Sequence, residues 1–185
     1  KRKSITVKAG GGGIYNYLLP AGVYLVSVES TDKKKFTKDT NYSLNFTSDY
    51  FPAENSTKTN PTALDLSQTE SQITASVSDF TGYGDSADYY YFVSSQAGAL
   101  NISITTSAKV KVFVYGAGMS KKLASKTLSK AGTYENIFSK DVLCPAGEIY
   151  IVVESADKGK GTYNAYYTLD VTDNLFPAEH STSTN

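Results

Sequence analysis

The sequence predicts an all-β protein made of antiparallel β-sandwich or jelly-roll modules in tandem, one complete and one a C-terminal half. Three observations lead to this prediction. Apolar and polar residues alternate along most of the chain, turn motifs recur every 8–15 residues, and one stretch returns at an offset of 125 residues. Alternation with a period of two is typical of strands with one buried face. The spacing of the turns is that of a sandwich or jelly roll.

The repeat sets the expected domain boundaries. Residues 20–60 align with residues 145–185 without a gap, and 21 of these 41 positions are identical. A period of this length corresponds to a whole domain rather than to one turn of a solenoid. We therefore expect four segments: a C-terminal half of a sandwich repeat in 1–50, a linker in 51–61, a complete repeat in 62–175, and the start of the next linker in 176–185.

The complete repeat is expected to contain eight strands, near 72–78, 87–94, 99–105, 108–115, 122–128, 134–143, 148–155 and 163–172. In most of them, every second residue is apolar, as a strand half buried in a sheet requires. Nine residues on these apolar faces are expected in one core: Leu100, Ile102, Ile104, Val110, Val112, Val114, Ile151, Leu169 and Val171.

The N-terminal half repeat poses a physical problem. Residues 4–50 hold about four expected strands but lack the partners that residues 72–115 supply in the complete repeat. Alone, such strands leave sheet edges open and a core uncovered. Two possibilities stay open: the protein continues upstream of this segment, or another chain completes the sandwich by strand addition.

Composition and charge exclude several function classes. Lysine plus arginine and aspartate plus glutamate balance at 18 each, which argues against nucleic acid or an anionic membrane surface as partner. No apolar run approaches the roughly 20 residues of a membrane-spanning helix. Cys144 is the only cysteine and is expected to be a small buried apolar residue. The fifteen tyrosines among many serines and threonines favour a secreted or cell-surface β-protein.

Three segments carry a family resemblance. GYGDSADYYYFVSSQAGALNISI (82–104), PAGEIYIVVES (145–155) and YYTLDV (166–171) resemble, in order, the motifs of bacterial pre-peptidase C-terminal domains. The resemblance covers about 62–172 fully and 4–47 as a C-terminal half. It implies a sandwich of eight or nine strands, attached to secreted bacterial proteases or repeated in large surface proteins, usually without catalysis of its own.

The same resemblance implies a calcium site. Related collagen-binding modules of clostridial collagenases hold calcium between an acidic linker and an Asp-x-x-Asp turn. The matching positions here are Glu54 and Asn55 in the linker and Asp85 and Asp88 in the turn. Those relatives carry a second linker acid, which is missing here, and Asp79 is the candidate to replace it. Calcium prefers such oxygen ligands, but an aspartate beside glycine also caps a tight turn without any metal.

An aromatic patch is the candidate ligand-binding surface. We expect Tyr90, Phe113 and Tyr115 to share an exposed face that stacks on sugar rings or covers a protein fibre, as exposed aromatic residues do at binding surfaces. Packing beneath a neighbouring repeat is the alternative. The acidic loop with Glu154 and Asp157 is expected to be a solvated hairpin turn with local ion pairs.

No catalytic machinery is expected. His180 is the only histidine, so a Ser-His-Asp triad or a histidine-based zinc site has nothing to build on. The sequence favours a non-catalytic extracellular repeat that acts as spacer, adhesin or assembly element, with calcium at its linkers. Its expected partners are neighbouring repeats, other copies of itself, and a polysaccharide or protein fibre. The alternatives are a substrate-targeting module of a secreted protease and a filament or surface-layer subunit assembled by strand complementation.

Overall fold

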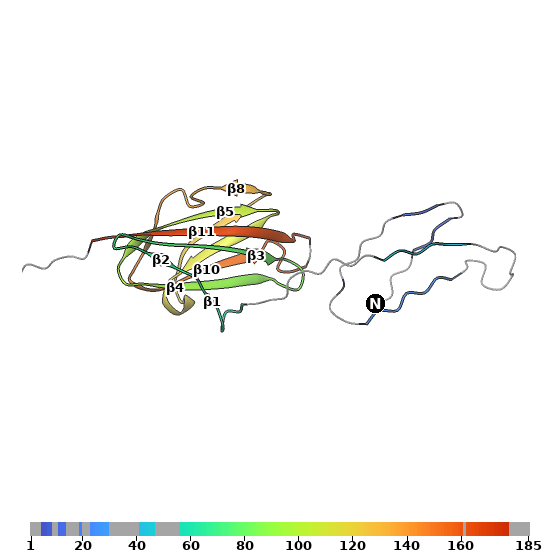
Figure 1. The fold of residues 1–185 in the computed structure, drawn as a ribbon, viewed down its shortest axis with the longest axis horizontal. Helices are drawn as coiled ribbons and strands as arrows, with labels where there is room; N and C mark the ends of the chain where they lie inside the picture. The colour runs from blue at the N-terminus through green and yellow to red at the C-terminus, as the bar shows by residue number, and fades with distance from the viewer. Residues whose placement is uncertain are drawn as a thin grey trace, which may run out of the picture. The chain divides into compact units, whose positions relative to one another are not determined.

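The structure is a computed structural model in which residues 5–8, 11–13, 19, 23–29, 41–46, 56–160 and 162–177 are described. The chain divides into two compact units, Lys1–Tyr50 and Phe51–Asn185. The second unit is a two-layered sandwich (Figure 1).

Its elements follow the alternating segments of the sequence closely. They are β1 (Thr62–Ala63), β2 (Ser67–Gln68), β3 (Gln72–Thr81), β4 (Ala87–Ser94), β5 (Gly98–Thr106), β6 (Val110–Tyr115), the 3-10 turn η1 (Ala117–Met119), β7 (Lys122–Leu128), β8 (Gly132–Tyr134), β9 (Val142–Cys144), β10 (Gly147–Ser155) and β11 (Ala165–Leu175). The short strands β1 and β2 are additions to the predicted set.

The strands form two sheets. One has the order β1-β4-β10-β6-β7, and the other has the order β2-β3-β11-β5-β8, with β9 also paired to β5. All pairings are antiparallel except that of β1 with β4. The two C-terminal strands therefore lie in the middle: β10 separates β4 from β6, and β11 separates β3 from β5. The antiparallel β-sandwich predicted from the sequence is confirmed.

The core lies between the two sheets and consists of the inward residues of each strand. All nine residues predicted to be buried are at most 3% exposed. The largest fully buried side chains include Tyr90 and Phe80 as well as the aliphatic residues. Cys144, at 3% exposure, packs in the same cluster, as expected.

Two expectations about the chain path were wrong. The single strand expected over 134–143 is two short strands, β8 and β9, separated by an irregular segment that contains Asn136, whose φ is 42°. A positive φ interrupts the extended backbone that a strand requires. The acidic loop after β10 is not a hairpin turn, since β10 and β11 belong to different sheets and the chain crosses between them.

In the first unit, described positions equivalent to core positions of the complete sandwich are exposed. Ile151, Leu169 and Val171 are 0%, 0% and 3% exposed, whereas their equivalents are much more open. These are Val26 at 61%, Leu44 at 48% and Phe46 at 69%. Since residues 1–50 have no counterpart of the sequence from β3 to β6, completion of this unit by upstream sequence or by another chain stays a prediction.

Candidate functional site

The outer face of the five-stranded sheet carries a group of aromatic side chains. Because residues alternate between the faces of a strand, the outward positions of β4, β10 and β6 lie side by side. Tyr91 faces Tyr150 across the β4–β10 pair, and Tyr150 faces Tyr115 across the β10–β6 pair. Phe113 faces Val152 in the same way. We call Tyr89, Tyr91, Phe113, Tyr115 and Tyr150 the aromatic face.

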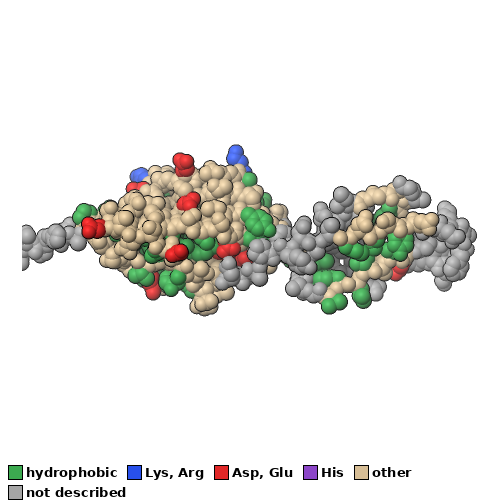
Figure 2. Space-filling model, in the orientation of Figure 1, with side chains coloured by type: hydrophobic (Ala, Val, Ile, Leu, Met, Phe, Trp, Pro, Cys, Tyr) green, Lys and Arg blue, Asp and Glu red, His purple; other side chains and the backbone are tan. Residues whose placement is uncertain are grey.

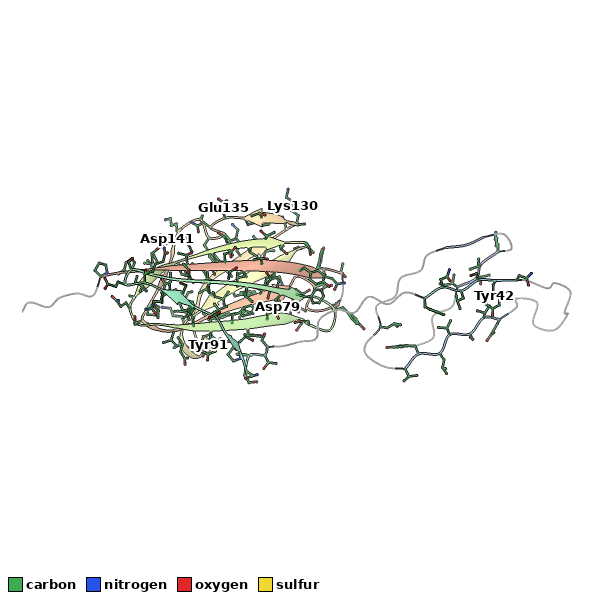
Figure 3. All side chains as sticks on the ribbon, viewed as in Figure 1. Tyr42, Asp79, Tyr91, Lys130, Glu135 and Asp141 are labelled. Carbon is green, nitrogen blue, oxygen red and sulfur yellow. The ribbon has the colours of Figure 1, made fainter. Side chains whose placement is uncertain are left out.

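The rings of the aromatic face are arranged in stacked pairs. The centroids of Tyr91 and Tyr150 lie 5.9 Å apart with planes at 28°, and those of Phe113 and Tyr115 lie 6.2 Å apart with planes at 27°. Beneath them, Val152 is only 5% exposed although it points away from the sandwich core. Figure 3 shows Tyr91 projecting from the sandwich beside β4. The rings thus form a flat, half-exposed apolar surface.

Of the three ligand-binding residues predicted from the sequence, the structure brings Phe113 and Tyr115 together and excludes Tyr90 from the exposed face. Tyr90 is 1% exposed and points into the core, where it lies opposite Ile151. Its inclusion in an exposed patch was wrong. Tyr91 and Tyr150 take its place; the alternation of Tyr150 with Ile149 and Ile151 was the signal that identified Tyr150 as outward.

Three of the five predicted metal residues, Asp79, Asp85 and Asp88, lie on β3, on β4 and in the turn between them. The turn is closed by backbone hydrogen bonds between Gly82 and Asp85, and the side chain of Thr81 donates to the carbonyl oxygen of Asp85. Gly84 has a φ of 82°, a conformation that favours glycine. Asp85 and Asp88 are both fully buried. The turn therefore holds two carboxylates in the protein interior.

A chain of hydrogen bonds connects two of the predicted carboxylates. Tyr90 donates to Oδ2 of Asp79 at 2.8 Å, Tyr167 donates to Oδ2 of Asp88 at 2.6 Å, and the two hydroxyl oxygens lie 2.7 Å apart. Burial and the charge of Asp88 raise the pKa of both tyrosines above the ordinary value, so the hydroxyls stay protonated.

The linker reaches this site at its described end. Ser56 is 1% exposed, and its hydroxyl oxygen accepts a hydrogen bond from the backbone N–H of Tyr89, the residue after Asp88. Glu54 and Asn55, the two linker ligands predicted from the sequence, lie outside the described residues. Within the described part of the chain, no group of three or more histidine, cysteine, aspartate or glutamate side chains is placed to hold a metal ion.

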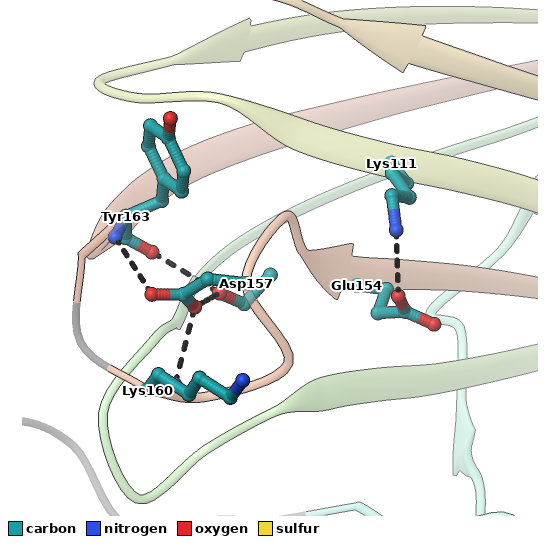
Figure 4. Close-up of polar contacts among 6 residues, drawn as sticks. Lys111, Glu154, Asp157, Lys160 and Tyr163 are labelled. Carbon is teal, nitrogen blue, oxygen red and sulfur yellow. Dashed lines mark hydrogen bonds and ion pairs between the residues drawn. The ribbon is translucent and has the colours of Figure 1, made fainter.

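The acidic loop between β10 and β11 is organised by one carboxylate. Asp157 accepts hydrogen bonds from the hydroxyl of Ser155 and from backbone N–H groups of Lys160, Thr162 and Tyr163 (Figure 4). Burial raises the pKa of Asp157, but the hydrogen bonds from Ser155, Thr162 and Tyr163 outweigh it and lower the pKa overall. Its role is structural.

Glu154, the other acid of this loop, pairs with Lys111 across the β10–β6 strands at 3.3 Å (Figure 4). The local ion pair expected here is thus present, although it links two strands rather than the ends of a turn. Among the described residues there is no helix long and apolar enough to cross a membrane.

Comparisons with known proteins give similarities in structure only. No family model and no curated protein matches the sequence. Among solved structures, the pre-peptidase C-terminal domain of a collagenase from Bacillus anthracis matches 66% of this chain and 99% of its own length, at 16% identity and a TM-score of 0.44. The periplasmic inhibitor of g-type lysozyme PliG from Aeromonas hydrophila matches 60% of this chain and 95% of its own length, at 12% identity and a TM-score of 0.38.

The carbohydrate-binding module CBM36, solved in complex with calcium and xylotriose, matches 58% of this chain and 91% of its own length, at 12% identity and a TM-score of 0.30. A domain of the kind that the sequence motifs resemble is thus among the similar structures.

Proposed function

We propose that this chain is a non-catalytic, extracellular binding repeat that holds an extended polymer, either a polysaccharide or a protein fibre, on its aromatic face. The observation that carries the proposal is the stacked arrangement of Tyr91 with Tyr150 and of Phe113 with Tyr115. Aromatic residues bury large apolar areas while their polar tips stay in water, which suits a surface that must be soluble and still bind. Within a tandem array, such a repeat works as an adhesin or an accessory targeting module.

The electrostatics of the aromatic face favour an uncharged or weakly charged ligand. Tyr150 donates its hydroxyl to Glu148 at 2.9 Å, and this hydrogen bond, the largest cause, raises the pKa of Tyr150. Lys111 and Glu154 neutralise one another on the same face. A face with paired charges and stacked rings selects by shape and stacking rather than by net charge.

A second part of the proposal is calcium at the linker end. The residues that would hold it are Asp79, Asp85 and Asp88 together with Glu54 and Asn55, a set composed only of oxygen donors, as calcium prefers. Support comes from the burial of Asp85 and Asp88 and from the docking of Ser56 next to Asp88.

Binding to insoluble polymers tests the role of the aromatic face. The full chain is mixed with cellulose, chitin, insoluble xylan and fibrillar collagen, and the bound fraction is measured after sedimentation. We expect one of these polymers to retain the chain and the double variant Tyr91→Ala/Tyr150→Ala to lower its affinity about tenfold or more, since each stacked ring contributes about 1 kcal/mol beyond its buried area.

Tyr166→Ala is the matched control, because Tyr166 is 54% exposed but lies on β11 in the other sheet. It should bind like the unaltered chain. If every polymer leaves the chain in solution, or if the double variant binds as well as the unaltered chain, the proposed role of the aromatic face is wrong.

A further inference from the structure

A groove of about 530 Å³ opens along one edge of the sandwich, and Lys122 in its lining lies opposite Tyr115 of the aromatic face. One wall is β7, the outermost strand of the five-stranded sheet. The other wall is the irregular segment 137–143, which is fixed to the second sheet by the hydrogen bond from the N–H of Ile137 to the carbonyl of Ile102 and by the pairing of β9 with β5. The floor includes Ile137, Phe138 and Val142, each at most 8% exposed.

Lysines dominate the charge of this groove. Lys121, Lys122, Lys126 and Lys140 line it against one carboxylate, Asp141. None of these four lysines forms an ion pair with any residue in the described part of the chain, where Lys111 pairs with Glu154 on another face. On the visible face of the sandwich in Figure 2, by contrast, acidic side chains are scattered singly. We call these four residues and the apolar floor the lysine groove.

Lys126 has an unusual position for a charged residue. It lies opposite Val112 in the β6–β7 register, on the same face of β7 as Ala124 and the buried Leu128. Its side chain therefore leaves the strand on the side of the sandwich interior and reaches the mouth of the groove. A lysine facing inward on an edge strand discourages pairing with ordinary apolar strands. A strand that brings a carboxylate to this position removes that obstacle.

The backbone of β7 completes the site. The sheet order ends at β7, and within the described residues no further strand pairs with its outer side. An edge strand of seven residues presents unpaired N–H and C=O groups to an incoming chain. An open strand edge, an apolar floor and four cations together match an extended polypeptide with alternating acidic and apolar residues.

We propose that the lysine groove is a docking site for an extended acidic polypeptide segment that adds to β7 as an antiparallel or parallel strand. Carboxylates on one side of that segment approach Lys122, Lys126 and Lys140, while apolar residues cover Phe138 and Ile137. This interaction is separate from the polymer bound on the aromatic face. It gives each repeat a second surface, with charge specificity, through which a protein partner joins the array.

Fluorescence anisotropy with a designed peptide tests the proposal. The probe is a fluorescein-labelled octapeptide of alternating valine and glutamate, and its counterpart has lysine in place of glutamate. The full chain should bind the acidic probe and not the basic one, and binding should weaken as salt rises, because exposed charge pairs are screened. Lys126→Ser/Lys140→Ser should lower the affinity for the acidic probe about tenfold or more.

Two control variants show whether binding depends on the groove itself. Lys109→Ser/Lys158→Ser removes the same charge outside the groove and should leave binding unchanged. Tyr91→Ala/Tyr150→Ala should also leave it unchanged, so failure of the polymer experiment and failure of this one are separate results. Equal binding of the acidic and basic probes, or no effect of the two groove substitutions, would overturn the proposal.

The backbone pairing has its own test. An acidic probe that is N-methylated at alternate residues keeps its charge but loses half of its strand hydrogen bonds, and it should bind at least tenfold more weakly. If the methylated probe binds equally well, or if a heparin fragment binds far more tightly than the acidic peptide, the groove recognises anionic charge alone and strand addition is wrong.

Discussion

Asp173 places an unusual carboxylate in the sandwich interior. It lies on the inward face of β11 with 0% exposure, and neither of its carboxylate oxygens has a hydrogen-bond partner among the described residues. The hydroxyl of Ser94 donates to the carbonyl of Gln96 instead. A Cβ added at Gly98 would collide with Oδ1 of Asp173, so the carboxylate fills the space that a side chain at Gly98 would need.

The charge of Asp173 affects its neighbours. Burial raises the pKa of Asp173. Burial and the charge of Asp173 raise the pKa of the Cys144 thiol to about 12, so this cysteine is an inert apolar residue at neutral pH. An ionised carboxylate without compensation lowers the stability of the fold.

We expect Asp173→Asn to stabilise the chain at neutral pH. Because the folded-state pKa lies above the unfolded value, the stabilising contribution of the protonated carboxyl is complete below the unfolded pKa. It is lost as pH rises through the folded pKa. The free energy of unfolding of the variant should therefore exceed that of the unaltered chain by about 1–2 kcal/mol at pH 7 and by little at pH 3.5. Thermal unfolding followed by circular dichroism at both pH values measures this difference.

Asp170→Asn is the control, because Asp170 is exposed on the opposite face of β11, where it accepts a hydrogen bond from Ser76. If Asp173→Asn increases the free energy of unfolding by the same amount at both pH values, burial of the charge is not the cause of the increase.

At the scale of the strand, the core-forming elements could be predicted because one face of each is apolar at every second position. For two parts of the chain, alternation did not predict which residues are buried, and the reasons are physical. Ile137 and Phe138 are adjacent and both buried, at 5% and 8% exposure, which a strand with alternating faces cannot achieve. In β4, the residues on the face of Tyr90 and the residues on the face of Tyr91 are equally apolar. The pairing of β4 with β10 therefore decides which face lies in the core.

The candidate site was less predictable than the core. Asp85 and Asp88 could be placed on a turn because GYGD marks one, but their connection to Asp79 through Tyr90 and Tyr167 depends on contacts between residues 11 to 79 positions apart. The lysine groove could not be predicted from the sequence, since its lysines become neighbours only when 137–143 packs beside β7.

Substitutions on the two faces of the five-stranded sheet should differ sharply in effect. Val112→Asp places a charge at a position with 0% exposure, opposite Val153 on β10 and Lys126 on β7, whereas Val93 is 55% exposed on the outer face of β4. We expect Val112→Asp to cost several kcal/mol and abolish the cooperative unfolding transition. Val93→Asp should change stability by less than about 1 kcal/mol. Urea unfolding of both variants decides this, and equal effects would contradict the assigned faces.

At the scale of the whole molecule, the proposed calcium site lies at the end of the sandwich where Ser56 contacts β4. Asp85 and Asp88 lie at this end, and Ser56 joins the linker to β4 beside them. We predict that the exposed apolar positions described in the first unit are covered by strands equivalent to β3 to β6 of the complete repeat. The prediction is that this cover comes either from the same polypeptide or from a second one.

Calcium should stabilise the full chain. Binding to the folded state alone adds about 2.7 kcal/mol at a calcium concentration one hundred times the Kd, so the melting temperature should rise with added calcium. Asp85→Ala/Asp88→Ala should remove this rise, whereas the exposed pair Asp65→Ala/Asp141→Ala should retain it. Titration calorimetry on the unaltered chain provides the independent check, and an absence of calcium uptake there would defeat the calcium proposal.

The central positions of β10 and β11 have a consequence for how the sandwich forms in time. Both strands are the last of the repeat to be synthesised, yet β4 and β6 are held together only through β10, and β3 and β5 only through β11. Tyr90 on β4 pairs with Ile151 on β10, and Val77 on β3 pairs with Leu169 on β11. Neither sheet can therefore reach its native register before these later strands have been synthesised. Folds that depend on such distant pairings form slowly. A partly synthesised repeat therefore lacks the native order of both sheets until β11, which ends at Leu175, has been synthesised.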